Sequence, residues 1–237
     1  MAVDAITFGG VNIGAYFRGI SIERRALPDI TPQTVDIPHK MGTTVLGVEV
    51  APLEITITGT INAQSALEVA AIRRNLARAL MPDADGGLKR LVMPDAPNVF
   101  YEAIVNGSTG LDRGYNHPHV SITFLVPAGC AFSEEKTKTL GTSFTVDGDL
   151  PCWPVVSLSS MSAESSATVS RTDSTGTRSI TVTAGVAGNV SVDMATDKVT
   201  NGALSLASNP FSLAPGSVST SVSGGSGTIK YRERWLS

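Results

Sequence analysis

The sequence has few aromatic residues, few charged residues and only two cysteines. Aromatic side chains make up 5% of the 237 residues, so a hydrophobic core must be built mainly from Val, Ile, Leu and Ala. Cys130 and Cys152 are too few for a disulfide framework. We expect two semi-buried thiols, although a single bridge between them stays open. The scarcity of cysteine argues against a small secreted domain held together by disulfides.

Positive charge is not in excess either. The chain has 18 Lys and Arg against 21 Asp and Glu, so the cationic surplus needed to hold phosphates tightly is missing. The most apolar stretch, residues 122–132, contains Thr123, Pro127 and Gly129 and is too short to span a bilayer. We therefore expect no tight nucleic-acid binding and no membrane insertion.

Motifs that carry chemistry are also missing. The sequence has no Gly-x-Ser-x-Gly nucleophile elbow, no Gly-Lys pair for a phosphate loop, no His-Glu-x-x-His and no Cys-x-x-Cys. His117 and His119 could share one face of a strand, but no acid or cysteine stands at ligand spacing, and a polar pair beside a hairpin explains them better. The sequence thus predicts no enzyme, no catalytic residue, no metal site and no cofactor.

Alternating apolar and polar residues are what the first part of the chain does have. Residues 55–61 alternate Ile or Gly with Thr, and residues 120–126 repeat the pattern, so both predict strands. One helix is predicted over residues 63–80, capped by Asn62 or Ser65. Further strands are predicted at residues 6–8, 19–23, 88–93 and 99–106.

The remainder of the chain reads as all-β. A polar segment at residues 134–139 is predicted to be a linker. Short strands separated by turn residues then follow at regular spacing, which indicates a sandwich. The fold class expected is mainly β, with a β-rich α+β domain at residues 1–140 that carries one main helix, and a β-sandwich at residues 141–237.

The order of these features resembles one known family, the distal tail proteins of siphophages and related prophages. The similarity covers nearly the full chain. In the first part it is carried by residues 8–12, 36–42, 47–59, 100–107 and 120–127. In the second part it is carried by residues 153–156, 192–194, 199–202, 211–216 and 231–235.

The resemblance implies a structural role in the tip of a phage tail. Such proteins form a homohexameric ring through the N-terminal domain, with a galectin-like sandwich at the periphery. The ring would join the tail tube protein to the tail-associated baseplate hub protein and let DNA pass. It implies assembly in the host cytoplasm and a final place at the virion tail tip. Residues 141–237 leave no room for the carbohydrate-binding insertions of some relatives.

A proline-rich arm at residues 28–42 is the predicted contact between subunits. Proline lacks a donor and restricts its predecessor, so the arm is expected to be extended and irregular rather than a central strand. Its length would let it reach a neighbouring copy. The residues predicted to make this contact are Pro28, Ile30, Pro32, Val35, Ile37, Pro38 and Met41.

An alternative function is the binding of host-surface carbohydrate by the sandwich. Trp153 could offer an aromatic face to a sugar ring. Both Trp153 and Trp235 stand in strand-like surroundings, however, and we expect core packing for both. A sandwich fold does not by itself imply sugar binding.

Overall fold

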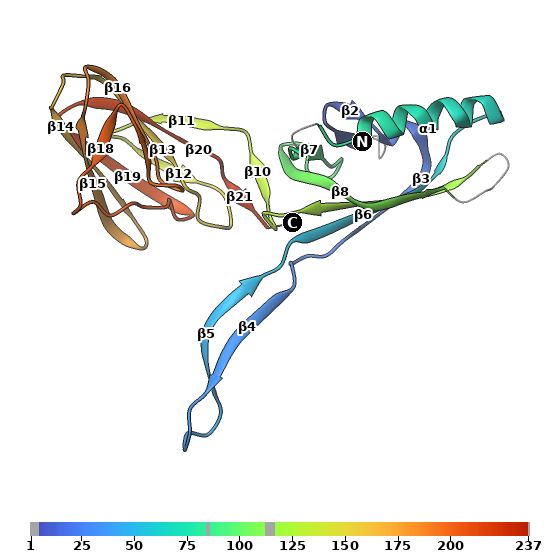
Figure 1. Cartoon of the computed structure of the whole chain (residues 1–237), viewed down its shortest axis with the longest axis horizontal. Coiled ribbons are helices and arrows are strands. Elements are labelled where there is room, and N and C mark those ends of the chain that lie inside the picture. Colours follow the sequence, from blue (N-terminus) through green and yellow to red (C-terminus); the bar gives the residue numbers. More distant parts are fainter. Residues whose placement is uncertain (1–4, 84–85, 112–116, 237) are drawn as a thin grey trace. The chain divides into compact units, whose positions relative to one another are not determined.

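The computed structural model describes residues 5–83, 86–111 and 117–236, which belong to two compact units (Figure 1). The first unit comprises Met1–Phe132 with Leu236–Ser237, and the second comprises Ser133–Trp235. The mainly β fold predicted from the sequence is confirmed, with a single α-helix among the described residues. The functional division at residues 140 and 141 stays a prediction.

The first unit is built on one antiparallel sheet with the strand order β2-β1-β7-β8-β9-β6-β3, and β10 pairs with β8 beside this path. A short 3-10 helix at Gly14–Tyr16 precedes β3. The strands are β1 (Thr7–Phe8), β2 (Val11–Asn12), β3 (Phe17–Arg24), β6 (Leu53–Ile61), β7 (Lys89–Val92), β8 (Val99–Leu111), β9 (His119–Val126) and β10 (Ala131–Ser133).

The predicted alternation places one face of this sheet in the core. On β6, Ile55 and Ile57 are buried, and on β9, Ile122 and Phe124 are buried opposite them. Phe124 packs against Phe8 of β1 with ring centroids 4.8 Å apart. Because successive side chains of a strand point to opposite faces, the other face of the same strands carries the intervening polar residues.

The helix α1 (Ala66–Leu80) covers part of the buried face beside β8 (Figure 1). Ser65 is its N-cap, as predicted: the Ser65 hydroxyl accepts a hydrogen bond of 3.2 Å from the backbone N–H of Glu68. The Glu68 carboxylate in turn accepts the N–H of Gln64 at 2.8 Å. This reciprocal pair satisfies two donors at the helix start, which fixes where the helix begins.

The second unit is a sandwich of two five-stranded antiparallel sheets, ordered β11-β20-β13-β16-β17 and β12-β19-β14-β15-β18. Valine side chains from both sheets meet in one core, and Phe144 of one sheet stacks on Tyr231 of the other at 5.4 Å. The strands of these two sheets are β11 (Lys136–Thr139), β12 (Ser143–Val146), β13 (Val155–Met161), β14 (Ser166–Asp173), β15 (Gly176–Ala184), β16 (Gly188–Asp193), β17 (Lys198–Thr200), β18 (Gly202–Leu204), β19 (Gly216–Ser223) and β20 (Ser226–Tyr231). A short strand β21 (Arg234–Trp235) follows and belongs to neither sheet.

A buried ion pair closes the β14–β15 hairpin. Arg171 and Asp173 are almost fully buried, and the guanidinium also donates to the hydroxyl of Thr175 at 2.9 Å. The second carboxylate oxygen of Asp173 accepts the N–H of Ala214 at 2.9 Å. Burial raises the pKa of Asp173, but the hydrogen bonds from Thr175 and Ala214, with the charge of Arg171, outweigh it and leave that pKa below its usual value.

Residues 134–139 are not the linker that the sequence predicted. Lys136 to Thr139 form β11, an edge strand that pairs with β20. The polar composition that suggested a linker is what edge strands often carry, because exposed edges need protection from other strands. Cys130 and Cys152 are both buried and form no disulfide, and burial raises the pKa of Cys152 to about 12.

Candidate assembly interface

The proline-rich arm is a regular β-hairpin of the first unit. β4 (Ile30–Asp36) pairs antiparallel with β5 (Thr43–Val50), and this two-stranded sheet is separate from the main sheet (Figure 1). The arm is extended as predicted, but the prediction of irregular structure was wrong. Pro32 is accommodated because each strand of a two-stranded ribbon has one unpaired edge, where a missing N–H costs no ladder bond.

The base of the hairpin is anchored to the body of the unit. Pro28 is buried, and a Cβ built on Gly129 would lie 3.3 Å from the Pro28 ring. Gly129 has φ +63°, a conformation that glycine adopts without strain. The carbonyl of Asp29 accepts the N–H of Ala51 at 2.9 Å. The hairpin is therefore fixed at its root, although its strands lie outside the core.

The hairpin has one apolar face, and that face is exposed to solvent. The strand register shifts by one residue between Gln33 and Thr34. This shift brings Val45 onto the same face as Val48, although an odd and an even position would otherwise lie on opposite faces. The exposed apolar residues on this face are Ile30, Pro32, Val45, Val48 and Val50. The opposite face carries Thr31, Gln33, Val35, Thr44 and Glu49.

Six of the seven residues predicted for subunit contact are exposed. Ile30, Pro32, Val35, Ile37, Pro38 and Met41 lie along β4 and the tip of the hairpin. Pro28 differs, since it is buried at the root and holds the hairpin in place. Sequence reasoning missed the contribution of β5. Val45, Val48 and Val50 indicated an apolar strand, but a strict period of two places Val45 on the other face. Only the bulge in the register brings Val45 onto the same face as Val48 and Val50.

The exposed apolar face needs a partner. A two-stranded hairpin alone is marginally stable in water, because it buries little apolar surface. Ile30 is 52% exposed and Met41 is fully exposed in the isolated chain. A contiguous apolar face of this kind, on an element that pairs only with itself, is typical of a protein–protein contact.

A second surface of interest is the polar face of the main sheet across β8, β9, β6 and β3. Its hydroxyl side chains are Ser21, Thr56, Thr58, Thr60, Ser121 and Thr123. Thr56 and Thr123 are joined by a hydrogen bond of 3.2 Å between their hydroxyls. Among the described residues of these strands, Glu23, Glu54 and Glu102 share the face with Arg18 and His119. The surface is hydroxyl-rich and without net positive charge.

The two tryptophans differ in their surroundings. Trp153 is 50% exposed, so the prediction of core packing was wrong for this residue. It lies between the isolated bridge of Cys152 to Leu213 and the start of β13, where the chain enters the sandwich. Trp235 is half-buried, with its indole nitrogen shielded from solvent.

The described residues contain no group of three or more His, Cys, Asp or Glu side chains that could hold a metal ion. The Nδ1 atom of His119 lies 3.4 Å from the hydroxyl of Thr60, a weak contact on the polar sheet face, and His117 is exposed. Across the described ranges no helix has the length and hydropathy required to cross a membrane.

Two family models match the chain. A phage tail protein RIFT-related domain matches residues 12–126, and a siphovirus-type tail component C-terminal domain matches residues 147–235. Together these matches cover most of both units. No curated protein sequence matches the chain significantly.

One solved structure similar to this chain has the same fold. The crystal structure of the Dit protein of phage SPP1, described as a paradigm of the hub adsorption apparatus in phages that infect Gram-positive bacteria, is 16% identical to this chain. The alignment covers 98% of this chain and 99% of that protein, with a TM-score of 0.76. A chain of the phage P2 baseplate in its activated conformation with Ca is 9% identical, with coverage of 89% and 90% and a TM-score of 0.46.

Proposed function

The chain belongs to the siphophage distal tail protein family, and from this premise we propose that six copies form a ring joining the tail tube to the baseplate hub. Family membership makes the protein a structural component of the phage tail. In the proposal, residues 1–140 form the ring and residues 141–237 form a galectin-like sandwich at its periphery. The partners are the tail tube protein and the tail-associated baseplate hub protein.

The apolar face of the β4–β5 hairpin is the observation that carries this proposal. In a monomer the five apolar side chains of this face stay exposed to water, which is unfavourable. An assembly can bury them and gain the free energy of removing apolar surface from water. The hairpin is rooted in the first unit, so its contacts would join first units to one another. A ring of six copies requires a head-to-tail contact, in which this face of each chain meets a different surface of the next copy.

The polar sheet face of the first unit fits the lumen of such a ring. DNA held by many cations would bind tightly through counterion release, and it would then move slowly. A wall of Ser and Thr hydroxyls offers few such contacts, because its charged side chains among the described residues of these four strands are Glu23, Glu54, Glu102 and Arg18. DNA could pass without being held. The proposal places assembly in the host cytoplasm, the finished ring at the virion tail tip, and no catalytic step or cofactor in either.

Electron microscopy and native mass spectrometry of the purified chain test the ring. Sixfold rings with a central opening are expected. A chain that stays monomeric at high concentration, and also fails to form rings with the tail tube and hub proteins, would contradict the proposal.

A matched pair of substitutions locates the contact. Val48→Ser lies on the apolar face and should abolish rings. Val35 was predicted from the sequence as a contact residue, but it lies on the opposite face of the same hairpin, so in this proposal Val35→Ser should leave rings intact. Both valines are exposed in the monomer, so neither change should disturb folding.

A second candidate function is recognition of host-surface carbohydrate through Trp153. The half-exposed indole is the observation in its favour, since aromatic faces stack on sugar rings. Glycan-array binding and titration with the full chain test it. Trp153→Ala should abolish binding, whereas Leu206→Ala, a fully exposed apolar control in the same unit, should not. Absence of binding by the unaltered chain would remove this candidate.

A further inference from the structure

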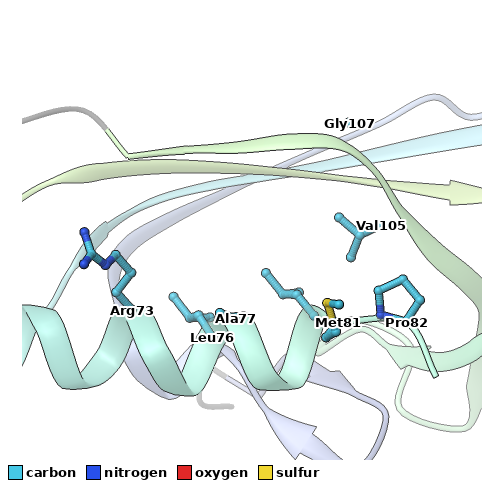
Figure 2. A pocket seen from close by; sticks show the side chains of 8 residues that line it. Arg73, Leu76, Ala77, Met81, Pro82, Val105 and Gly107 are labelled. Carbon is cyan, nitrogen blue, oxygen red and sulfur yellow. The ribbon is translucent and has the colours of Figure 1, made fainter. Parts of the chain in front are cut away.

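A groove lies between α1 and β8 on the first unit, away from the polar sheet face. Its volume is about 420 Å³, within the range of roughly 300–1,000 Å³ that ligand sites occupy. Leu76, Ala77 and Met81 of the helix and its end face Val105 of β8 across the opening (Figure 2). The lining is therefore apolar on both sides.

One charged side chain lies at the margin of this groove. Arg73 lines it one turn before Leu76 and Ala77, and its guanidinium is exposed (Figure 2). Arg74 is also exposed but does not line the groove. Among the described residues, the groove thus combines an apolar floor with the cation of Arg73 at one end, and it suits an apolar segment that carries a nearby carboxylate.

The hairpin has the matching combination. Met41 at its tip is fully exposed, and methionine is an unbranched side chain that fits irregular apolar spaces. Asp36 pairs with Thr43 at the tip end of the apolar face, and its carboxylate is exposed. Lys40 also lies at the tip, but its Nζ atom is 3.5 Å from the hydroxyl of Thr44, on the face opposite to Asp36. On the face of Asp36, an apolar tip beside one acid complements an apolar groove beside one arginine.

We infer that the hairpin tip of one copy seats in the α1–β8 groove of a neighbouring copy, with Asp36 facing Arg73. This inference rests on the proposed ring and names the surface that receives the hairpin. Within one chain the hairpin extends from the ends of β3 and β6, away from α1, so the two surfaces do not meet (Figure 1). Two different patches that join successive copies make a head-to-tail contact, which closes into a ring when the rotation allows it.

Disulfide trapping tests the contact directly. Met41→Cys combined with Ala77→Cys should give a ladder of covalent oligomers up to the hexamer under oxidising conditions. Met41→Cys combined with Leu67→Cys is the control, because Leu67 is exposed on the same helix but does not line the groove. The native cysteines are buried and should not contribute.

Each outcome separates the inference from the function on which it rests. Rings seen by electron microscopy without a ladder would overturn the groove contact and leave the proposed ring standing. The absence of both rings and ladder would overturn both. A ladder equally strong in the Leu67→Cys control would show nonspecific trapping and would also overturn the groove contact.

Charge exchange provides a second readout that needs no new cysteine. Asp36→Arg and Arg73→Asp should each raise the protomer concentration needed for half-assembly at least about tenfold, and the double exchange should recover most of that loss. Arg74→Asp is the matched control and should change assembly little. Failure of the double exchange to recover more than either single variant would contradict the pairing of Asp36 with Arg73.

Discussion

The β4–β5 hairpin and the β14–β15 hairpin each have one apolar and one polar face, but β4–β5 is a separate two-stranded sheet whereas β14–β15 is part of a five-stranded one. In the sandwich, Val169 and Ile180 are completely buried against the opposite sheet. In the first unit, Val48 and Ile30 remain exposed. The difference shows that the same alternation of residues can build a core within one chain or a contact surface between chains.

The polar face of the β14–β15 hairpin is also stabilised, by hydrogen bonds between its strands. Across β14 and β15, Thr168 and Thr181 are hydrogen-bonded at 3.1 Å, and Thr172 and Thr177 at 2.8 Å. Such cross-strand pairs contribute roughly 0.2–1 kcal/mol each to sheet stability. The β14–β15 ribbon is therefore stabilised on both faces, whereas the β4–β5 ribbon has its apolar face unpaired in the isolated chain.

The largest expected effect is on the ion pair that closes β14–β15. Asp173→Ala leaves Arg171 buried without its partner, which should lower the free energy of unfolding of the second unit by about 3–5 kcal/mol. Both tryptophans lie in that unit, so their fluorescence in a urea titration reports its unfolding. Glu135→Ala, which breaks an exposed pair with Lys230, is the control and should cost less than about 1 kcal/mol.

The same substitution in the two ribbons should have unequal effects. Ile180→Ala removes a fully buried side chain and should lower the free energy of unfolding by about 2–5 kcal/mol. Ile30→Ala removes one that is half-exposed, and the monomer should change by less than about 0.5 kcal/mol while assembly weakens. Equal losses of monomer stability would show that the β4–β5 hairpin packs within its own chain.

The start of α1 offers a smaller test within the first unit. Ser65→Ala removes the hydroxyl that accepts the N–H of Glu68, so the free energy of unfolding of that unit should fall by about 1 kcal/mol. Hydrogen exchange at the first turn of the helix would locate the effect. Ser65→Asp keeps an acceptor and should restore most of the loss. A full effect in both variants would indicate a cause other than capping.

The free energy of unfolding of the second unit should fall gradually in acid because of Asp173 in the β14–β15 hairpin. The pKa of Asp173 is lower in the folded protein than its unfolded value of about 3.9. Its contribution to stability is therefore complete above the unfolded value and is lost as pH falls through the folded one. Urea titrations between pH 5 and pH 2 should show a steeper decline for the unaltered chain than for Asp173→Asn.

Much of the fold could be predicted because its signals are local. The strands around Ile57 and Phe124 alternate cleanly, and Ser65 caps the helix where the sequence allowed. The β11 edge strand was missed because edge strands are polar and resemble linkers. Trp153 was misplaced because an apolar residue is assigned to the core by its type, while its exposure depends on which distant segments cover it.

The candidate interface could be predicted only in part. Proline content pointed to the arm, and that location does hold exposed apolar residues. The contribution of Val45 and Val48 depends on a single bulged register step that no local rule anticipates. The groove beside α1 arises from a helix and a strand separated along the chain, so the sequence offered no sign of it.

The sequence by itself determined the helix, the strands with clean alternation, the mainly β class and the absence of catalytic motifs, because these depend on residue type and short-range period. Tertiary structure alone decided which apolar faces are covered. Coverage depends on segments far away in the chain. The opposite sheet of the sandwich packs on Ile180 and buries it, whereas no described segment of the first unit covers the apolar face of the β4–β5 hairpin. That unequal coverage is the physical reason to regard one ribbon as core and the other as interface.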